Sequence, residues 1–145
     1  MIRVPGIPAP QGSKRHVGHG VLIESSRSVG PWRERVALHL VESHPSKPRR
    51  DYIAVHLTFC FPRPKSHFKK DGTLRASAPK FPGRPDIDKL VRAILDAMTG
   101  IVFVDDSQVI RLTATKVYDT TPGVDIDWIW VVAEGNEADG AGVRA

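Results

Sequence analysis

The stretch Asp86-Ile-Asp-Lys-Leu-Val-Arg-Ala-Ile-Leu-Asp-Ala-Met-Thr99 carries the strongest helical pattern in the chain. Its large apolar residues recur three or four positions apart, so that they line one stripe of a helix. These residues are Ile87, Leu90, Val91, Ile94, Leu95 and Met98. Pro85 and Asp86 suit a helix start, and Gly100 suits a C-terminal stop. We therefore expect an amphipathic helix over residues 86–99 that packs one face on a core.

Strand patterns lie on both sides of this helix. Tyr52–Phe61 alternates with period two, which is typical of a half-buried strand, and Val109–Tyr118 alternates in the same way. The remaining expected elements are an edge strand from Ile2, a strand at Gly20–Glu24, a helix from Pro31 to about Ser43, a turn at Thr121-Pro-Gly and a last strand at Val124–Val132. This order predicts an α+β (or mixed α/β) fold, a mixed sheet with about two main helices on one face, and leaves the strand connections open.

Length and composition fit one globular domain. The chain has 145 residues and 16.0 kDa, with 41% hydrophobic and 26% charged residues. We expect a folded unit at 1–133 and a disordered tail at 134–145. No apolar run reaches the roughly 18 residues that span a bilayer, the start has no secretory pattern, and Cys60 has no partner cysteine. We therefore expect a cytoplasmic protein that does not cross a membrane.

The charges are unevenly distributed along the chain. Residues 1–85 carry 16 Lys and Arg against 5 Asp and Glu, a net of +11, whereas residues 86–145 carry 5 against 11, a net of −6. A basic excess attracts polyanions such as nucleic acid, and a few carboxylates can hold a divalent metal against one phosphate. The alternative is a solvated surface on which the two signs merely segregate.

Residues 62–85 form the least foldable part of the sequence, with five prolines and seven Lys or Arg. We expect a long mobile loop in which cations grip a DNA backbone while Phe68 or Phe81 stacks on bases or wedges between them. The alternative is a linker that touches nothing. A second basic cluster, expected on a turn, contains Lys14, Arg15, His16 and His19. The candidate DNA-binding residues are Lys14, Arg15, Lys69, Lys70, Arg75, Lys80, Arg84, Lys89, Phe68 and Phe81.

Four aspartates form two pairs at the two ends of the predicted helix. Asp86 and Asp88 lie in its first turn, and Asp105 and Asp106 lie in a turn before the next strand. Each pair has a structural interpretation, as helix caps or as an acidic turn. Fourteen residues of helix span about 20 Å, so either a returning segment brings the pairs together or they belong to different ends of the unit. If they converge, their short oxygen ligands suit Mg²⁺ or Mn²⁺.

Other polar residues have two interpretations each. Arg92 and Asp96 continue from Asp88 at helical spacing, either as an ion-pair ladder or with Arg92 as a clamp on a scissile phosphate. His56, Asp125 and Asp127 are interpreted as solvent-facing strand residues rather than ligands, and Trp128 and Trp130 as core or dimer-interface residues.

The run from Arg84 to Gly100, followed by Val104-Asp-Asp-Ser-Gln-Val, resembles the RusA family of Holliday junction resolvases. Supporting pieces are Val4-Pro-Gly-Ile-Pro-Ala-Pro-Gln-Gly and Lys116-Val-Tyr, and the resemblance extends to about residue 132. It implies a homodimeric endonuclease that nicks four-way DNA symmetrically with Mg²⁺ or Mn²⁺ and without a small-molecule cofactor.

The resemblance also implies roles for individual residues. Asp86, Asp88 and Asp106 would bind metal with Asp105 as a neighbour, and each site would be formed by the helix start and turn of one subunit. Lys89 stands where the family has Asn, and Arg92 stands at the family's catalytic Lys; an arginine donates charge but does not act as a general base.

Two other classes of protein fit parts of the pattern. A non-catalytic nucleic-acid-binding module would need only the basic segment. Asp-x-Asp phosphatases and sugar-nucleotide transferases carry their motif after a strand of a larger domain, whereas this motif opens a helix, which disfavours that class.

Overall fold

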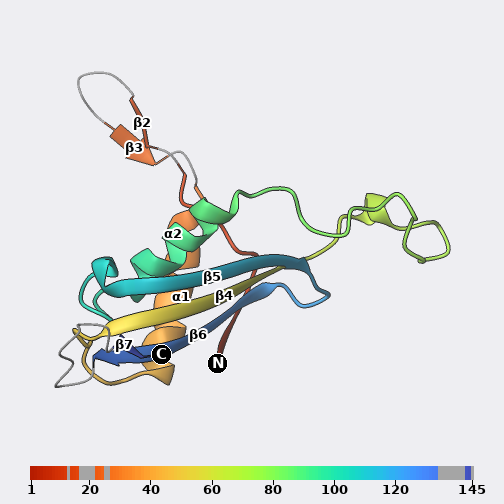
Figure 1. Cartoon of the computed structure of the whole chain (residues 1–145). Coiled ribbons are helices and arrows are strands. Elements are labelled where there is room, and N and C mark those ends of the chain that lie inside the picture. The colour runs from red at the N-terminus through yellow and green to blue at the C-terminus, as the bar shows by residue number, and fades with distance from the viewer. Residues whose placement is uncertain (13, 17–21, 25–26, 134–142, 145) are drawn as a thin grey trace.

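A computed structural model describes residues 1–12, 14–16, 22–24, 27–133 and 143–144 (Figure 1). In chain order its elements are β1 (Ile2–Pro5), β2 (Lys14–His16), β3 (Leu22–Glu24), α1 (Val29–Ser43), β4 (Tyr52–Phe61), the 3₁₀ turn η1 (Lys65–His67), α2 (Ile87–Met98), the 3₁₀ turn η2 (Asp106–Gln108), β5 (Val109–Tyr118), β6 (Gly123–Ala133) and β7 (Val143–Arg144). No described helix is long and apolar enough to cross a membrane.

The main sheet is mixed. Its strand order is β1-β6-β4-β5, with β7 also paired to β6. β4 and β5 run parallel, and α2 forms the crossover between them, whereas β6 is antiparallel to both β4 and β1. β4 therefore separates β5 from β6, although these two strands follow one another in the sequence.

Both helices cover the same face of the sheet, as predicted (Figure 1). Fully buried side chains come from α1, β4, α2 and β6, among them Val36, Leu40, Ile53, Leu57, Phe59, Leu90, Ile94, Met98 and Ile126. Burial of each such side chain stabilises the fold by about 1.5–3 kcal/mol before entropy is counted. The α+β class and the two-helix architecture expected from the sequence are thus confirmed.

The predicted helix at residues 86–99 is confirmed as α2. Its inward stripe includes Leu90, Ile94 and Met98, all fully buried, whereas Ile87 at the first turn is partly exposed. Gly100 ends the helix with a φ of +84°, a conformation that glycine adopts at little cost. The crossover helix therefore has fixed ends, and each end carries one of the aspartate pairs.

β4 is more buried than its alternation predicted. Ala54 and Cys60 lie on the face opposite the helices and are nevertheless buried, because β4 has a neighbouring strand on each side. Trp128 and Trp130 lie on the helix-covered face beside Val55 and Ile53, in agreement with a core role.

The described part of the basic cluster that begins at Lys14 is not on a turn as expected. Lys14–His16 forms β2, which pairs antiparallel with β3, so this segment is one half of a two-stranded hairpin. His19 lies outside the described residues. Most of the predicted tail at 134–145 also lies outside them, and Val143–Arg144 pairs with the end of β6.

Candidate nucleic-acid and metal site

The first aspartate pair opens α2 without capping it. Asp86 occupies the N-cap position, but its side chain makes no capping hydrogen bond and is 63% exposed. Its nearest charged partner is Lys89, with Nζ 3.9 Å from a carboxylate oxygen. Asp88 is exposed and has no hydrogen bond or ion pair with any described residue. The capping interpretation therefore does not account for these two carboxylates, although both lie at the positive end of the helix dipole.

Lys116 of β5 fixes the chain just before this pair. Its ammonium group donates to the carbonyl oxygens of Gly83 at 2.6 Å and Pro85 at 2.9 Å. Lys116 sits on the helix-covered face of β5, beside Phe59 of β4. The sequence analysis named Lys116 only as a supporting piece of the resemblance and gave it no role. The available signal for a role was a lysine at a position where the strand alternation predicts an inward side chain.

The second pair, at η2, has two different roles. Asp105 occupies the N-cap position of the turn: its carboxylate accepts a hydrogen bond from Ser107 Oγ at 2.6 Å, and its backbone carbonyl oxygen accepts one from the Gln108 N–H at 3.0 Å. The structural interpretation is thus confirmed for Asp105. Asp106 is exposed, and its carboxylate makes no hydrogen bond or ion pair within the described part of the chain. Only Asp106 of this pair has both carboxylate oxygens free.

Gln108 holds η2 on the end of the sheet. Its side-chain oxygen accepts from the backbone N–H groups of Val104 and Asp105, both at 2.9 Å. Its amide nitrogen donates to the carbonyl oxygens of Arg49 at 2.8 Å and Asp51 at 2.7 Å. Gln108 is 9% exposed, so a buried side chain uses four hydrogen bonds to position the loop that carries Asp106.

Within one chain the two aspartate pairs do not converge. They lie at opposite ends of α2, whose 12 residues span about 18 Å. Among the described residues, no three His, Cys, Asp or Glu side chains gather in a way that could hold a metal ion. The site residues implied by the resemblance therefore stay a prediction, and within a single described chain they do not form one shared cluster.

Arg92 lies one turn after Asp88 on the outer side of α2. The predicted Asp-Arg-Asp ladder does not form, because Asp96 pairs with Arg33 of α1 at 3.5 Å instead. Arg92 is exposed and has no ion pair with a described residue. Its guanidinium group is consequently available to an external anion.

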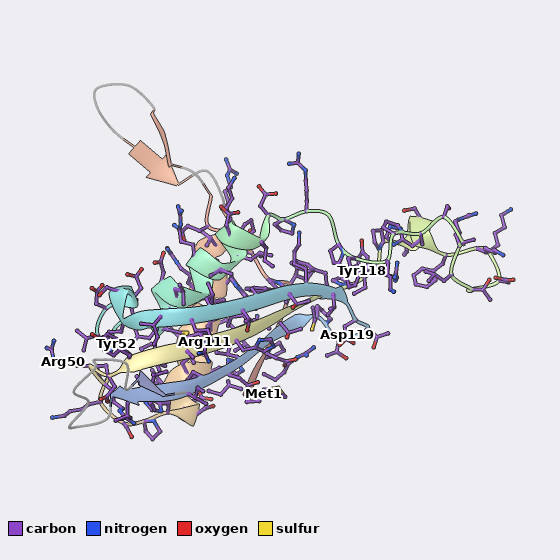
Figure 2. The ribbon with its side chains drawn as sticks, viewed as in Figure 1. Met1, Arg50, Tyr52, Arg111, Tyr118 and Asp119 are labelled. Carbon is purple, nitrogen blue, oxygen red and sulfur yellow. The ribbon has the colours of Figure 1, made fainter. Side chains whose placement is uncertain are left out.

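Residues 62–85 form an arm that projects from the end of the sheet (Figures 1 and 2). The arm contains η1 and a tight turn closed by the pairing of Phe68 with Leu74. At its tip the Asp71 carboxylate accepts from the Thr73 hydroxyl at 2.6 Å and from its backbone N–H at 2.9 Å, which lowers the pKa of Asp71. The predicted long loop thus has defined local structure, and its mobility stays a prediction.

The arm is anchored at its root on Tyr118, the last residue of β5. The guanidinium group of Arg63 lies 4.2 Å from the centre of the Tyr118 ring, and His67 contacts the same ring edge-on at 5.5 Å. Arg63 also donates to the Pro79 carbonyl oxygen at 2.8 Å. The exposed cations of the arm that form no ion pair with a described residue include Lys69, Lys70, Arg75, Lys80 and Arg84.

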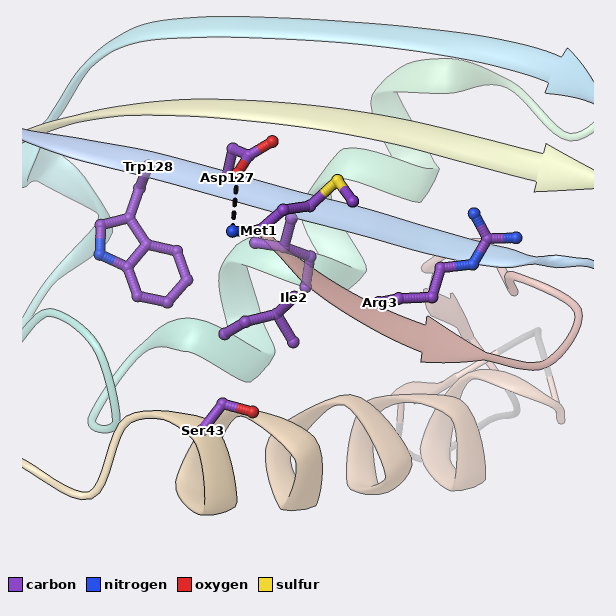
Figure 3. A pocket seen from close by; sticks show the side chains of 7 residues that line it. Met1, Ile2, Arg3, Ser43, Asp127 and Trp128 are labelled. Atoms are coloured by element: carbon purple, nitrogen blue, oxygen red, sulfur yellow. Dashed lines mark ion pairs between the residues drawn. The ribbon is translucent and has the colours of Figure 1, made fainter.

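A hollow of about 470 Å³ at the other end of the molecule is separate from these groups (Figure 3). It lies between β1 and the end of α1, and an ion pair of 3.1 Å joins the Met1 amino group to Asp127. Asp125 is likewise paired, with Arg3 at 3.0 Å. His56 bonds to the Thr113 hydroxyl. None of these polar strand residues is placed with the two aspartate pairs.

A small α+β domain that combines free carboxylates with a projecting cationic arm has the features of proteins that act on nucleic-acid backbones. The family model described as endodeoxyribonuclease RusA matches residues 5–127, and the chain belongs to this family. The chain is also similar to "Uncharacterized protein YqaN" of Bacillus subtilis (strain 168), with 37% identity over 43 residues. This alignment covers 30% of each protein, so the chain spans less than a third of that relative's length.

Proposed function

We propose that this protein is a metal-dependent endodeoxyribonuclease that resolves four-way DNA junctions by paired symmetric nicks. The observation that carries the proposal is the pair Asp86 and Asp88, exposed at the start of α2 without the capping bonds that would explain them. Membership of the RusA endodeoxyribonuclease family supports the same activity. The cationic arm supplies the charge that a branched polyanion requires.

The donor set fits Mg²⁺ or Mn²⁺. Asp86, Asp88 and Asp106 offer hard carboxylate oxygens, and all three are exposed and free of strong internal hydrogen bonds. A bound divalent cation would supply a more acidic water molecule and offset charge on the leaving oxygen. Because about 18 Å of helix separates Asp106 from the other two, we propose that a shared site takes Asp106 from a second copy of the chain.

β5 is the strand through which such a homodimer would form. It lies at the edge of the sheet, and Ile110 and Leu112 on it are 48% and 41% exposed. Antiparallel pairing of two β5 strands would place the start of one beside the end of the other. The start of β5 follows Asp106, and its end holds the start of α2 through Lys116. This pairing would therefore bring the two kinds of aspartate together.

Arg92 would hold positive charge beside the scissile phosphate. It lies one helical turn from Asp88, and no described carboxylate competes for it. Since arginine stays protonated and cannot accept the proton of the attacking water, Arg92 would stabilise charge rather than act as a base.

The DNA backbone would lie along the arm and the hairpin. Exposed cations at Lys69, Lys70 and Arg75 would contact phosphates, and Phe68 and Phe81 would contact bases. The remaining proposed contacts are Lys14, Arg15, Lys80, Arg84 and Lys89. Phosphate contacts of this kind predict binding that weakens steeply as salt increases.

The test uses a mobile synthetic four-way junction with Mg²⁺ and maps nicks on all four strands. Wild type should give symmetric pairs of nicks. Asp88→Asn should abolish them while binding stays the same or becomes tighter, because a negative charge near the phosphates is removed. Asp96→Asn, on the same helix but paired to Arg33, is the matched control and should cleave normally. Full cleavage by Asp88→Asn would contradict the proposal.

A second candidate is a non-catalytic, structure-selective DNA-binding protein. The observation that favours it is the separation of the aspartate pairs within one chain. It predicts salt-sensitive junction binding with no nicks across titrations of Mg²⁺ and Mn²⁺. Symmetric nicks by the purified wild type, lost in Asp88→Asn, would exclude it.

A further inference from the structure

A hollow of about 800 Å³ lies between the arm and the end of β5, at the place where Tyr118 and Asp119 are labelled in Figure 2. Its walls are mostly aromatic or aliphatic, and two cations stand at its rim. The lining includes Arg63, Phe68, Leu74, Lys80, Phe81 and Tyr118. The hollow is large enough for a nucleotide-sized ligand.

The apolar walls of this hollow are left open to solvent. Phe68 is 37% exposed, Leu74 is 47% exposed and Phe81 is 55% exposed. None of the three belongs to the hydrophobic core. Because three neighbouring apolar side chains on a cationic arm gain nothing from solvent, their exposure points to a ligand with an apolar face.

The hollow is held in shape before any ligand arrives. Tyr118 is fixed between Arg63 and His67, and the guanidinium group of Arg63 also reaches the Pro79 carbonyl oxygen. Phe68 and Leu74 are paired through their backbones. A preformed hollow loses little conformational entropy on binding, which favours recognition of one defined group.

Charge at the rim indicates an anionic ligand. Lys80 and Arg63 flank the apolar walls, and the arm from 62 to 85 carries seven Lys or Arg against one Asp. Asp119 is the acidic residue of the lining, and its carboxylate accepts the Thr121 backbone N–H at 3.1 Å and lies 4.0 Å from Arg3. Apolar walls beside two cations fit a ligand that joins a flat apolar group to an anion. A nucleotide, with its base and its phosphate, has both parts, whereas an apolar peptide lacks the anion.

We infer that this hollow binds a single unpaired nucleotide, with its base against Phe81 or Phe68 and its phosphate beside Lys80 and Arg63. The inference rests on the proposed action on DNA and names the feature of the substrate that the arm recognises. A continuous duplex keeps its bases stacked, whereas a branch or bulge presents a base that can leave the helix. The arm would thus select DNA for an unstacked base rather than for its charge alone.

The test compares two duplexes of the same sequence, one with a single unpaired 5-iododeoxyuridine, in EDTA so that no cleavage occurs. Wild type should prefer the bulged duplex, and irradiation should cross-link the iodinated base to a peptide containing Phe68, Phe81 or Tyr118. Base–aromatic stacking predicts that Phe81→Ala weakens bulge binding on the order of tenfold while duplex binding hardly changes. Phe81 is 55% exposed, so its truncation should leave the fold intact.

Matched variants separate stacking from charge. Tyr52→Ala removes an equally exposed aromatic side chain at the far end of β4 and should have no effect. Lys80→Ala should weaken bulge binding more than duplex binding, whereas Lys70→Ala, outside the hollow, should weaken both alike. Equal wild-type affinity for the two duplexes, or a cross-link only to other peptides, would overturn the inference.

Failure of this inference and failure of the nuclease proposal give different results. Cleavage of the junction that depends on Asp88, together with equal affinity for the bulged and the continuous duplex, would refute the nucleotide site and leave the nuclease proposal standing. A preference for the bulged duplex that depends on Phe81, without any cleavage of the junction, would support the nucleotide site and refute the nuclease proposal. Binding of an apolar peptide in the hollow, together with no binding of the bulged DNA there, would also count against the nucleotide site.

Discussion

Replacement of the buried Gln108 by alanine should destabilise the protein by several times the contribution of a single exposed hydrogen bond. The substitution removes four hydrogen bonds at once, two accepted and two donated by one buried amide. A hydrogen bond contributes about 1 kcal/mol net, so the set accounts for about 4 kcal/mol. Water can reach the exposed residues Arg49 and Asp51 and replace part of the lost bonding, which sets the expected loss at about 2–4 kcal/mol.

The assay is equilibrium urea unfolding followed by tryptophan fluorescence, with the free energy of unfolding taken from linear extrapolation. Ser107→Ala is the matched control, because it removes one exposed hydrogen bond to Asp105 and should cost at most about 1 kcal/mol. A loss below about 1 kcal/mol for Gln108→Ala would refute the account of η2 as a loop fixed by one buried side chain.

Three further predictions concern the site and the arm. Lys116→Met should speed amide hydrogen exchange at the start of α2 and reduce junction cleavage, because the carbonyl groups before Asp86 lose their donor; unchanged exchange there would contradict this. Arg92→Ala should lower the cleavage rate on the order of a hundredfold with junction binding nearly unchanged, and Arg92→Lys should restore much of the rate, as expected of a charge-stabilising group; a wild-type rate for Arg92→Ala would remove Arg92 from the site. The Asp71 carboxyl should titrate below its usual range in NMR experiments, so the order that its hydrogen bonds give the arm tip is present above the ordinary carboxyl pKa and is lost as pH falls through the lowered value. Thr73→Val should return that pKa toward its ordinary value, and a pKa of Asp71 that is already ordinary in wild type would contradict the described turn.

Local patterns predicted the elements of this fold well. The apolar stripe of α2 and the alternation of β4 were readable because each depends on neighbours within one turn or one strand. The parallel pairing of β4 with β5 was not readable, because alternation does not encode a strand's partner or direction. The same limit explains why the sequence analysis left the strand connections open, including the separation of β5 from β6 by β4.

The candidate site divides in the same way. The motif identified the four aspartates. It did not show that Asp105 caps η2 whereas the carboxylate of Asp106 is free, because this difference depends on hydrogen bonds around Gln108 that residue spacing does not predict. The length of the predicted helix already indicated that the two aspartate pairs could lie far apart. Only the fold showed that the chain after α2 does not run back to bring Asp105 and Asp106 beside Asp86 and Asp88. Contacts such as Arg63 on Tyr118 join residues far apart in the chain and left no local signal.

The position of β4 has a consequence for biosynthesis. Both of its hydrogen-bonding neighbours are C-terminal to it, with Ile53 opposite Val109 on one side and Trp130 on the other. β1 likewise pairs with a strand that is synthesised much later, because Val4 lies opposite Val124 of β6. While the ribosome is still translating α2, the nascent polypeptide therefore holds a ten-residue apolar strand with no ladder partner. Such late, long-range closure slows folding and exposes that strand to chaperones and to aggregation until β5 and β6 have been synthesised.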